Sequence, residues 1–226
     1  MSNFLYLDIE TIPDQTPGAL EAIRATIEPP GNISKPETIA KWMEENAVAK
    51  SEEAWRKTAL DGSKGEVVVA GWAFNDFVPR RVIRDSLRPD DEKRLLFDTF
   101  ESILMELETL PDAPLTIVGH CVKDFDLRFL FQRAVIAGVR PTFDLGVGQR
   151  YPAHVYDTMT EWAGWGNRIS LANLCKALNV PVKQGGIDGS MVWDLVKSNR
   201  VVEVADYCCT DVVAVRECHR RMTFAG

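Results

Sequence analysis

The sequence predicts a single α/β domain, residues 1–226, built on a mixed five-stranded sheet flanked by helices. An apolar segment opens the chain, and a second apolar segment ends at a short turn, Asn75-Asp76, which is expected to join it to a further strand. The rest of the chain alternates apolar segments with helical patterns. A strand hairpin followed by alternating strands and helices is typical of a mixed sheet. The length of 226 residues suffices for one sizeable core.

Runs of apolar and β-branched residues, bounded by turn-forming residues, indicate the strands. The first run, NFLYLDI, ends before Thr11-Ile12-Pro13, and the second, EVVVAGWAF, precedes the Asn75-Asp76 turn. The expected strands cover residues 3–9, 66–74, 80–87, 115–119 and 154–156.

Apolar residues at helical spacing indicate four helices between and after these strands. Asp90 or Asp91 is expected to cap the first, Gly138 to close the second, and Asp157 to cap a short turn. The expected helices cover residues 90–110, 124–137, 170–178 and 201–222. The core-facing stripe of the last helix is expected to consist of Ala205, Cys208, Val212 and Val215.

Residues 14–65 differ from the rest of the chain and are interpreted as a helical insertion between the first two strands. The segment is rich in Pro, Glu and Lys, and Ser34 with Glu37 has the spacing of a capping box. Two short amphipathic helices carrying Trp42 and Trp55 are expected. The insertion either covers a substrate groove or packs its own tryptophans against the core. In the first case five basic residues would meet phosphates: Lys41, Lys50, Arg56, Lys57 and Lys64.

Composition excludes several functional classes. No apolar run approaches the roughly 18 to 20 residues of a membrane helix. The N-terminus has no basic region before Asp8, and the five cysteines include no CxxC pair, so a cytoplasmic location with reduced thiols is expected. The formal charge of -7 argues against a protein that coats duplex DNA. A nuclease that contacts a nucleic-acid end briefly needs only a local basic surface.

Asp8 and Glu10 form the first pair of candidate functional residues. Two residues apart on a strand, they project from one face, whereas Leu7 and Ile9 point the other way. Like charges on an apolar strand are costly unless cations pair with them. The pair therefore indicates a metal site, and the alternative is a strand that frays at residue 8.

Asp126 and the Tyr207–Asp211 pair are the other candidates. Asp126 follows the fourth strand on the first turn of a helix, where it could also serve only to complement the helix N-terminus. Tyr207 and Asp211 lie four residues apart and share one face of the last helix. On its own, such a pair is usually a surface hydrogen bond.

Other chemistries fail on spacing. Cys208 and Cys218 are separated by roughly 15 Å of helix, too far to share a zinc ion with Cys209 and His219. Gly62-Ser63-Lys64-Gly65 lacks the spacing of a phosphate-binding loop. No nucleophile elbow supports a serine hydrolase.

Taken together and in order, these acids resemble the three motifs of the DEDD 3′→5′ exonucleases. Residues 8–11 match the first motif, 120–126 the second and 207–211 the third. The stretches 143–157 and 183–195 are also similar to the subgroup that resembles the proofreading domain of family-B DNA polymerases. The sequence is identified as a member of the tyrosine subclass, because the histidine subclass requires His five residues before Asp211, where this chain has Asp206.

One residue departs from the family pattern. The second motif usually carries Asn where this chain has Cys121. That Asn is not a metal ligand in the family, so the departure concerns packing next to Asp126.

The resemblance implies an RNase H-like fold and two Mg²⁺ or Mn²⁺ ions. Their implied ligands are Asp8, Glu10, Asp126 and Asp211. Tyr207 would orient the attacking water, because a phenol with a pKa near 10 is a poor base at neutral pH.

Substrate contacts are also implied. The main chain of Thr11 and Ile12 would approach the terminal nucleotide, and His120 and Lys123 would contact phosphate. A packed, hydrogen-bonded histidine is an equal alternative for His120. Trp72 could stack a base, although a tryptophan in a buried strand is more often core.

The leading hypothesis for function is a 3′→5′ exonuclease acting on single-stranded DNA or DNA 3′ ends. An RNA-trimming exonuclease with the same chemistry is the second hypothesis, because these motifs do not report on the 2′-OH. A non-catalytic module that binds a replication or repair partner is the third. The presence of all four acids and the tyrosine disfavours it.

Overall fold

The computed structural model describes the chain except residues 1, 151, 182–185 and 226. Its centre is the expected mixed five-stranded sheet, with strand order β3-β2-β1-β4-β5. The first three strands along this order pair antiparallel, and β1, β4 and β5 run parallel. The strands are β1 (Asn3–Ile12), β2 (Glu66–Phe74), β3 (Arg80–Ile83), β4 (Leu115–Gly119) and β5 (Val155–Asp157).

The first strand is longer than the sequence predicts. A register shift falls between Glu10 and Thr11, after which Thr11 pairs with Val67 and Ile12 with Glu66. Pairing with β2 thus carries the strand past the expected end at residue 9. The third strand is shorter than expected, because its ladder with β2 ends at Ile83.

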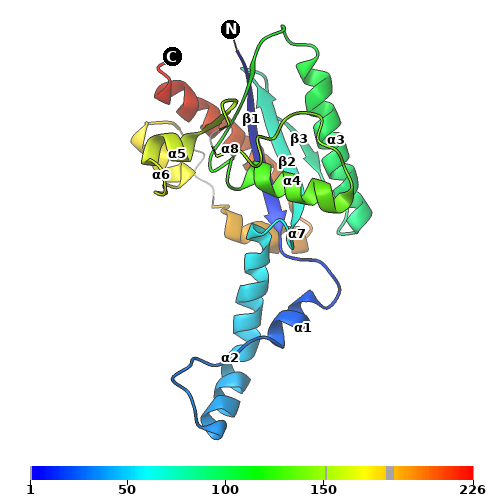
Figure 1. Ribbon diagram of the computed structural model, residues 1–226, viewed down its shortest axis with the longest axis vertical. Coiled ribbons are helices and arrows are strands. Elements are labelled where there is room, and N and C mark those ends of the chain that lie inside the picture. Colours follow the sequence, from blue (N-terminus) through cyan, green and yellow to red (C-terminus); the bar gives the residue numbers. More distant parts are fainter. Residues whose placement is uncertain (1, 151, 182–185, 226) are drawn as a thin grey trace.

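Helices cover both faces of the sheet (Figure 1). Helices α3 (Pro89–Leu107) and α4 (Asp126–Ala137) pack on one face, and α8 (Val201–Met222) packs on the other. Three short helices complete the body: α5 (Thr158–Ala163), α6 (Leu171–Ala177) and α7 (Val192–Lys197). A 3₁₀ turn, η2 (Gly189–Met191), precedes α7.

The alternation of side chains along β1 places the acids on the α8 face. Leu5, Leu7 and Ile9 belong to the core beneath α3 and α4, whereas Tyr6 packs with residues of α8. Because successive side chains of a strand point to opposite faces, Asp8 and Glu10 share the α8 side with Tyr6.

Most predicted helices are present, with corrections at their ends. Helix α3 begins at Pro89, and the N-cap residue is Arg88, which makes no side-chain capping hydrogen bond. Asp90 and Asp91 lie inside the helix and are therefore not the cap. Helix α4 ends at Gly138 with φ of 66°, as predicted. Helix α7 was not predicted, and the short turn expected after Asp157 is helix α5.

The insertion forms an arm that projects from one end of the body (Figure 1). It contains α1 (Ala19–Arg24), α2 (Pro36–Arg56) and η1 (Lys57–Leu60). The single long helix α2 carries both Trp42 and Trp55, in place of the two short helices expected. The predicted capping box is wrong, because α2 starts after Lys35 without a side-chain cap.

Tryptophan contacts dock the arm on the body. The Trp55 ring meets Trp193 of α7 edge-to-face at 5.3 Å, and within the arm its indole nitrogen donates to the Asp14 carbonyl oxygen at 2.8 Å. Arg56 adds a two-point ion pair with Asp194 of α7.

Among the described residues, no helix combines the length and apolarity required to cross a membrane.

Candidate metal centre

A glycine on β2 brings α8 close to β1. Gly71 pairs with Asp8 across the strands, and a Cβ at position 71 would lie 2.7 Å from the Cys208 sulfur. The Cys208 thiol donates to the Asp8 carbonyl oxygen at 3.5 Å. The absence of a side chain at Gly71 therefore allows the close approach that sets Tyr207 and Asp211 beside the first strand.

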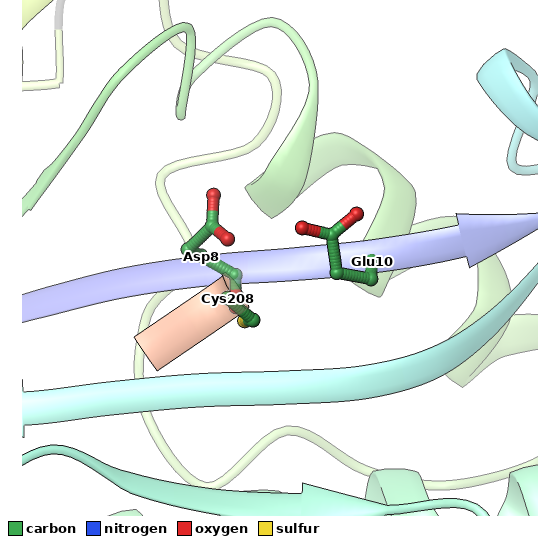
Figure 2. Close-up of side chains that lie close together, drawn as sticks. All are labelled: Asp8, Glu10 and Cys208. Atoms are coloured by element: carbon green, nitrogen blue, oxygen red, sulfur yellow. The ribbon is translucent and has the colours of Figure 1, made fainter. Parts of the chain in front are cut away.

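Acids from three segments meet at this contact. Figure 2 shows the Asp8 and Glu10 carboxylates leaving β1 in the same direction. One ligand atom from each of Asp8, Glu10 and Cys208 lies within 4.8 Å of the others. Asp126, the first residue of α4, reaches the edge of β1, where its Oδ1 accepts a hydrogen bond from the Ile9 amide at 3.1 Å.

Electrostatics link all four carboxylates. Burial, followed by repulsion from Glu10, Asp126 and Asp211, raises the pKa of Asp8 well above its usual range. Burial raises the pKa of Glu10 in the same way, with Asp211 and Asp126 as the repelling neighbours. The acids therefore lie close enough to oppose one another's ionisation.

The other two acids are also shifted. Burial raises the pKa of Asp126 to about 8, although backbone hydrogen bonds oppose the rise. Burial raises the pKa of Asp211 to about 6, and the hydrogen bond from Tyr207 opposes that rise. The Asp8 Oδ2 atom is buried and has no hydrogen-bond partner among the described residues. An anionic cluster with an unpaired buried oxygen is an environment in which a cation would be stabilised.

Tyr207 is a donor in this cluster. Burial raises the pKa of its phenol well above the usual value, and the charges of Asp211 and Glu10 raise it further. The hydroxyl hydrogen-bonds to Asp211 and remains protonated at neutral pH. It is therefore suited to hold an oxygen in place and unsuited to act as a base.

The loop that precedes Asp126 is held by Asp157. Its carboxylate accepts hydrogen bonds from the main-chain amides of Cys121 at 3.0 Å and Lys123 at 3.2 Å. It also caps α5 by accepting from Met159 at 3.0 Å. The sequence predicted only this capping role. The position of Asp157 at the end of β5, beside the end of β4, was the available signal for the second role.

His120 has protein partners at both ring nitrogens. Nδ1 lies 3.0 Å from the Thr158 hydroxyl, and Nε2 lies 2.9 Å from the Ile169 carbonyl oxygen. Burial lowers its pKa. The structure thus favours the packed, neutral histidine over a phosphate contact.

The other residues predicted to contact substrate are in different environments. The Thr11 hydroxyl donates to the Ala59 carbonyl oxygen at 2.7 Å, and the Ile12 side chain is fully buried, so only their main chain is left for a substrate. Both residues lie inside β1 and do not follow it. The Lys123 ammonium lies near Asp124 and over the Trp165 ring. Trp72 is core, and its indole nitrogen donates to Glu106 at 3.1 Å.

The cysteines fall in different parts of the fold. All five are free thiols, and the Cys218 sulfur lies 3.5 Å from that of Cys175, not beside Cys208. The contact of Cys208 with the acids was not predicted. The prediction that Cys208 belongs to the core-facing stripe of the last helix is correct, because its side chain is buried.

Comparisons with known proteins identify the family and the fold of this chain. Residues 81–223 match the model of a family described as a predicted 3′-5′ exonuclease related to the exonuclease domain of PolB. This match covers more than half of the chain, so the chain belongs to that family. Asp126, Tyr207 and Asp211 fall inside the matched range, and Asp8 and Glu10 precede it.

A solved structure shows the same fold over nearly the whole chain. The family B DNA polymerase from the hyperthermophilic archaeon Pyrobaculum calidifontis superposes with a TM-score of 0.56 at 14% identity, over 96% of this chain. The chain spans 24% of that polymerase chain. No curated protein matches. The predicted relationship and the mixed α/β fold are confirmed. Of the 183–195 stretch used for the resemblance, residues 183–185 lie outside the described residues.

Proposed function

We propose that this chain hydrolyses phosphodiester bonds from the 3′ end of single-stranded DNA, with two divalent cations held by Asp8, Glu10, Asp126 and Asp211. The observation that carries the proposal is the buried Asp8 Oδ2 atom, which has no hydrogen-bond partner among the described residues and belongs to a carboxyl whose pKa is raised by burial and by the charges of Glu10, Asp126 and Asp211. Membership of a predicted exonuclease family supports the reaction class.

The donor set fits Mg²⁺ or Mn²⁺. Carboxylate oxygens suit hard divalent cations, and burial raises the pKa of each acid, so a cation that offsets the repulsion would favour the ionised ligands. A pair of such ions, when bound, neutralises charge on the reacting phosphate and activates the attacking water.

The chain's own residues position the reacting groups. The Ile9 amide holds the Asp126 carboxylate, and Asp157 holds the loop before it. Tyr207 keeps its proton and hydrogen-bonds to Asp211. In this position its hydroxyl orients the attacking water. Catalysis then depends on position and charge, as expected for phosphoryl transfer.

An end-labelling experiment tests the proposal. The protein is incubated with 5′-labelled and 3′-labelled single-stranded DNA and RNA in Mg²⁺, Mn²⁺ or EDTA. We expect 5′-labelled DNA to shorten stepwise, 3′-labelled DNA to release a labelled mononucleotide first, and EDTA to abolish both. Asp98→Asn, on α3 outside the cluster, is the matched control for loss of a carboxylate.

Three results contradict parts of the proposal. Release of the 5′ label first would refute the polarity. Faster hydrolysis of RNA than of DNA would replace the substrate with RNA. Binding without metal-dependent hydrolysis would support the non-catalytic module instead.

A further inference from the structure

A tryptophan with two cations on its ring stands on the loop between α5 and α6. Trp165 is 53% exposed, and its ring centroid lies 4.8 Å from the Lys123 ammonium nitrogen and 5.3 Å from the Arg150 guanidinium carbon. An indole face is a stacking surface for any nucleobase, and adjacent cations attract phosphates. This combination is the usual chemistry of single-strand binding.

The loop that presents Trp165 has a defined conformation. Gly164 and Gly166 flank the tryptophan with φ of 79° and 81°, values that glycine adopts without strain. The Asn167 amide donates to the Gly164 carbonyl oxygen at 3.2 Å, and the Asn167 side chain donates to Ala163 at 3.1 Å. The indole is therefore held on a tight turn between α5 and α6.

Contacts tie this loop to the segment that carries Asp126. The Ile169 carbonyl oxygen, at the end of the loop, lies 2.9 Å from His120 Nε2. Lys123 precedes Asp126 by three residues, and Asp157 fixes its main chain. Packed, neutral His120 thus acquires a positioning role. It joins the aromatic loop to the candidate metal centre.

The two cations at the Trp165 ring stand on a molecule that is acidic overall. The chain carries a formal charge of -7, and the reaction site itself is a cluster of acids, so the molecule as a whole repels a polyanion. Lys123 and Arg150 both lie over the Trp165 ring, with Asp124 at 4.0 Å from Lys123 as an acidic neighbour.

We propose that Trp165, Lys123 and Arg150 form a subsite for single-stranded nucleic acid 5′ to the scissile bond. A base stacks on the exposed indole, and its neighbouring phosphates contact the two cations. The inference rests on the proposed function for the position of the scissile bond, but binding by this surface does not depend on hydrolysis.

Binding is measured in an Asp211→Asn background, which is expected not to cut the probe. Fluorescence anisotropy with a 5′-labelled 12-nucleotide single strand gives Kd at several salt concentrations. Trp165→Ala is expected to weaken binding about 10-fold, and Trp165→Phe to restore most of the loss, since a phenyl ring still stacks. Arg150→Gln is expected to reduce the salt slope by about 0.7, the loss of one phosphate contact. Phe97→Ala, which removes an equally exposed aromatic side chain from α3, is the control and should change neither quantity.

Hydrolysis separates this subsite from the reaction centre. With active protein, Trp165→Ala should lower kcat/KM on the 12-nucleotide strand about 10-fold more than on the p-nitrophenyl ester of thymidine 5′-monophosphate, which is too short to reach the indole. Equal losses on both substrates would overturn the subsite.

The two proposals fail differently. If the protein hydrolyses neither substrate but Trp165→Ala still weakens binding and Trp165→Phe restores it, the proposed function fails and the subsite stands. If Trp165→Ala leaves Kd unchanged, or if the parent protein binds no single strand, the subsite is refuted.

Discussion

The carboxylates of Asp8, Glu10 and Asp211 destabilise the metal-free fold, because burial removes their charges from water and, for Asp8 and Glu10, neighbouring carboxylates repel them as well. A carboxyl whose pKa rises on folding opposes stability increasingly as pH rises through the interval between its two values. For Asp211 that interval runs from its usual 3.8 to about 6. Above this range the metal-free protein bears the full penalty.

Asp211→Asn and Asp8→Asn should each lower nuclease activity by about 1000-fold, which corresponds to roughly 4 kcal/mol of transition-state stabilisation. In EDTA at pH 7, thermal unfolding should show an unchanged or slightly raised Tm, because a repelling charge is gone. Full activity in either variant would remove that residue from the metal centre.

Tyr207→Phe should lower turnover by about 100-fold and leave Mn²⁺ affinity nearly unchanged, because the ring stays and only the hydroxyl is lost. Calorimetric Mn²⁺ titration beside a nuclease assay measures both effects. A variant that cuts at the wild-type rate would show that the phenol does not orient the attacking water.

Cys121 is in the left-handed region, with φ of 62°. Among residues with a side chain, Asn tolerates this conformation best, which gives a backbone reason for the Asn usual in the family. Cys121→Asn should raise the free energy of unfolding by about 0.5 kcal/mol and retain activity. Cys121→Val, which is β-branched, should lower it by about 1–2 kcal/mol. Urea unfolding measures the free energy of unfolding of both variants. A large loss of stability or activity in Cys121→Asn would mean that the thiol is required for local packing.

At the scale of elements, the distance between α8 and the sheet decides whether the acids meet. Gly71 sets that distance, since a Cβ there would press on the Cys208 sulfur at 2.7 Å. Both Tyr207 and Asp211 are carried by the helix that would move.

Gly71→Ala should therefore lower the free energy of unfolding by about 2 kcal/mol through overpacking and reduce activity as α8 shifts. Gly31→Ala is the control, because a Cβ at that position meets nothing within 4 Å. Chemical denaturation and the nuclease assay supply the two readouts. Unchanged activity in Gly71→Ala would show that the site tolerates displacement of the helix.

At the scale of the whole molecule, the arm and the body have different surfaces. Acidic residues outnumber basic ones between positions 14 and 65. Each of the five basic residues expected to meet phosphate forms an ion pair with an acid instead. Trp55 is buried in the docking contact with Trp193. These contacts favour a structural arm over a cover for the substrate.

The double variant Lys50→Glu and Lys57→Glu should leave KM and its salt dependence unchanged, and should reduce stability by less than about 1 kcal/mol, because exposed pairs contribute little. Both lysines pair with Glu53, at 3.0 and 2.8 Å. A steady-state series at several salt concentrations checks this. A raised KM with a flatter salt slope would restore the covering role of the arm.

Local periodicity was sufficient to predict much of this molecule. The bounds of α8, the glycine at the end of α4 and the succession of strands along the chain follow from apolar spacing and turn residues, which act over a few neighbours. The same holds for the shared face of Asp8 and Glu10 and for the pairing of Tyr207 with Asp211. These relations are set by helix and strand geometry alone.

Contacts between distant residues required the tertiary structure. The approach of Cys208 to Gly71, the hold of Asp157 on Cys121, the two partners of His120 and the cations around Trp165 each join segments far apart in the chain. The extension of β1 to Ile12 and the docking of the arm also depend on partners elsewhere. Short-range patterns contain no information about such partners, because packing density and hydrogen bonds across the fold decide them.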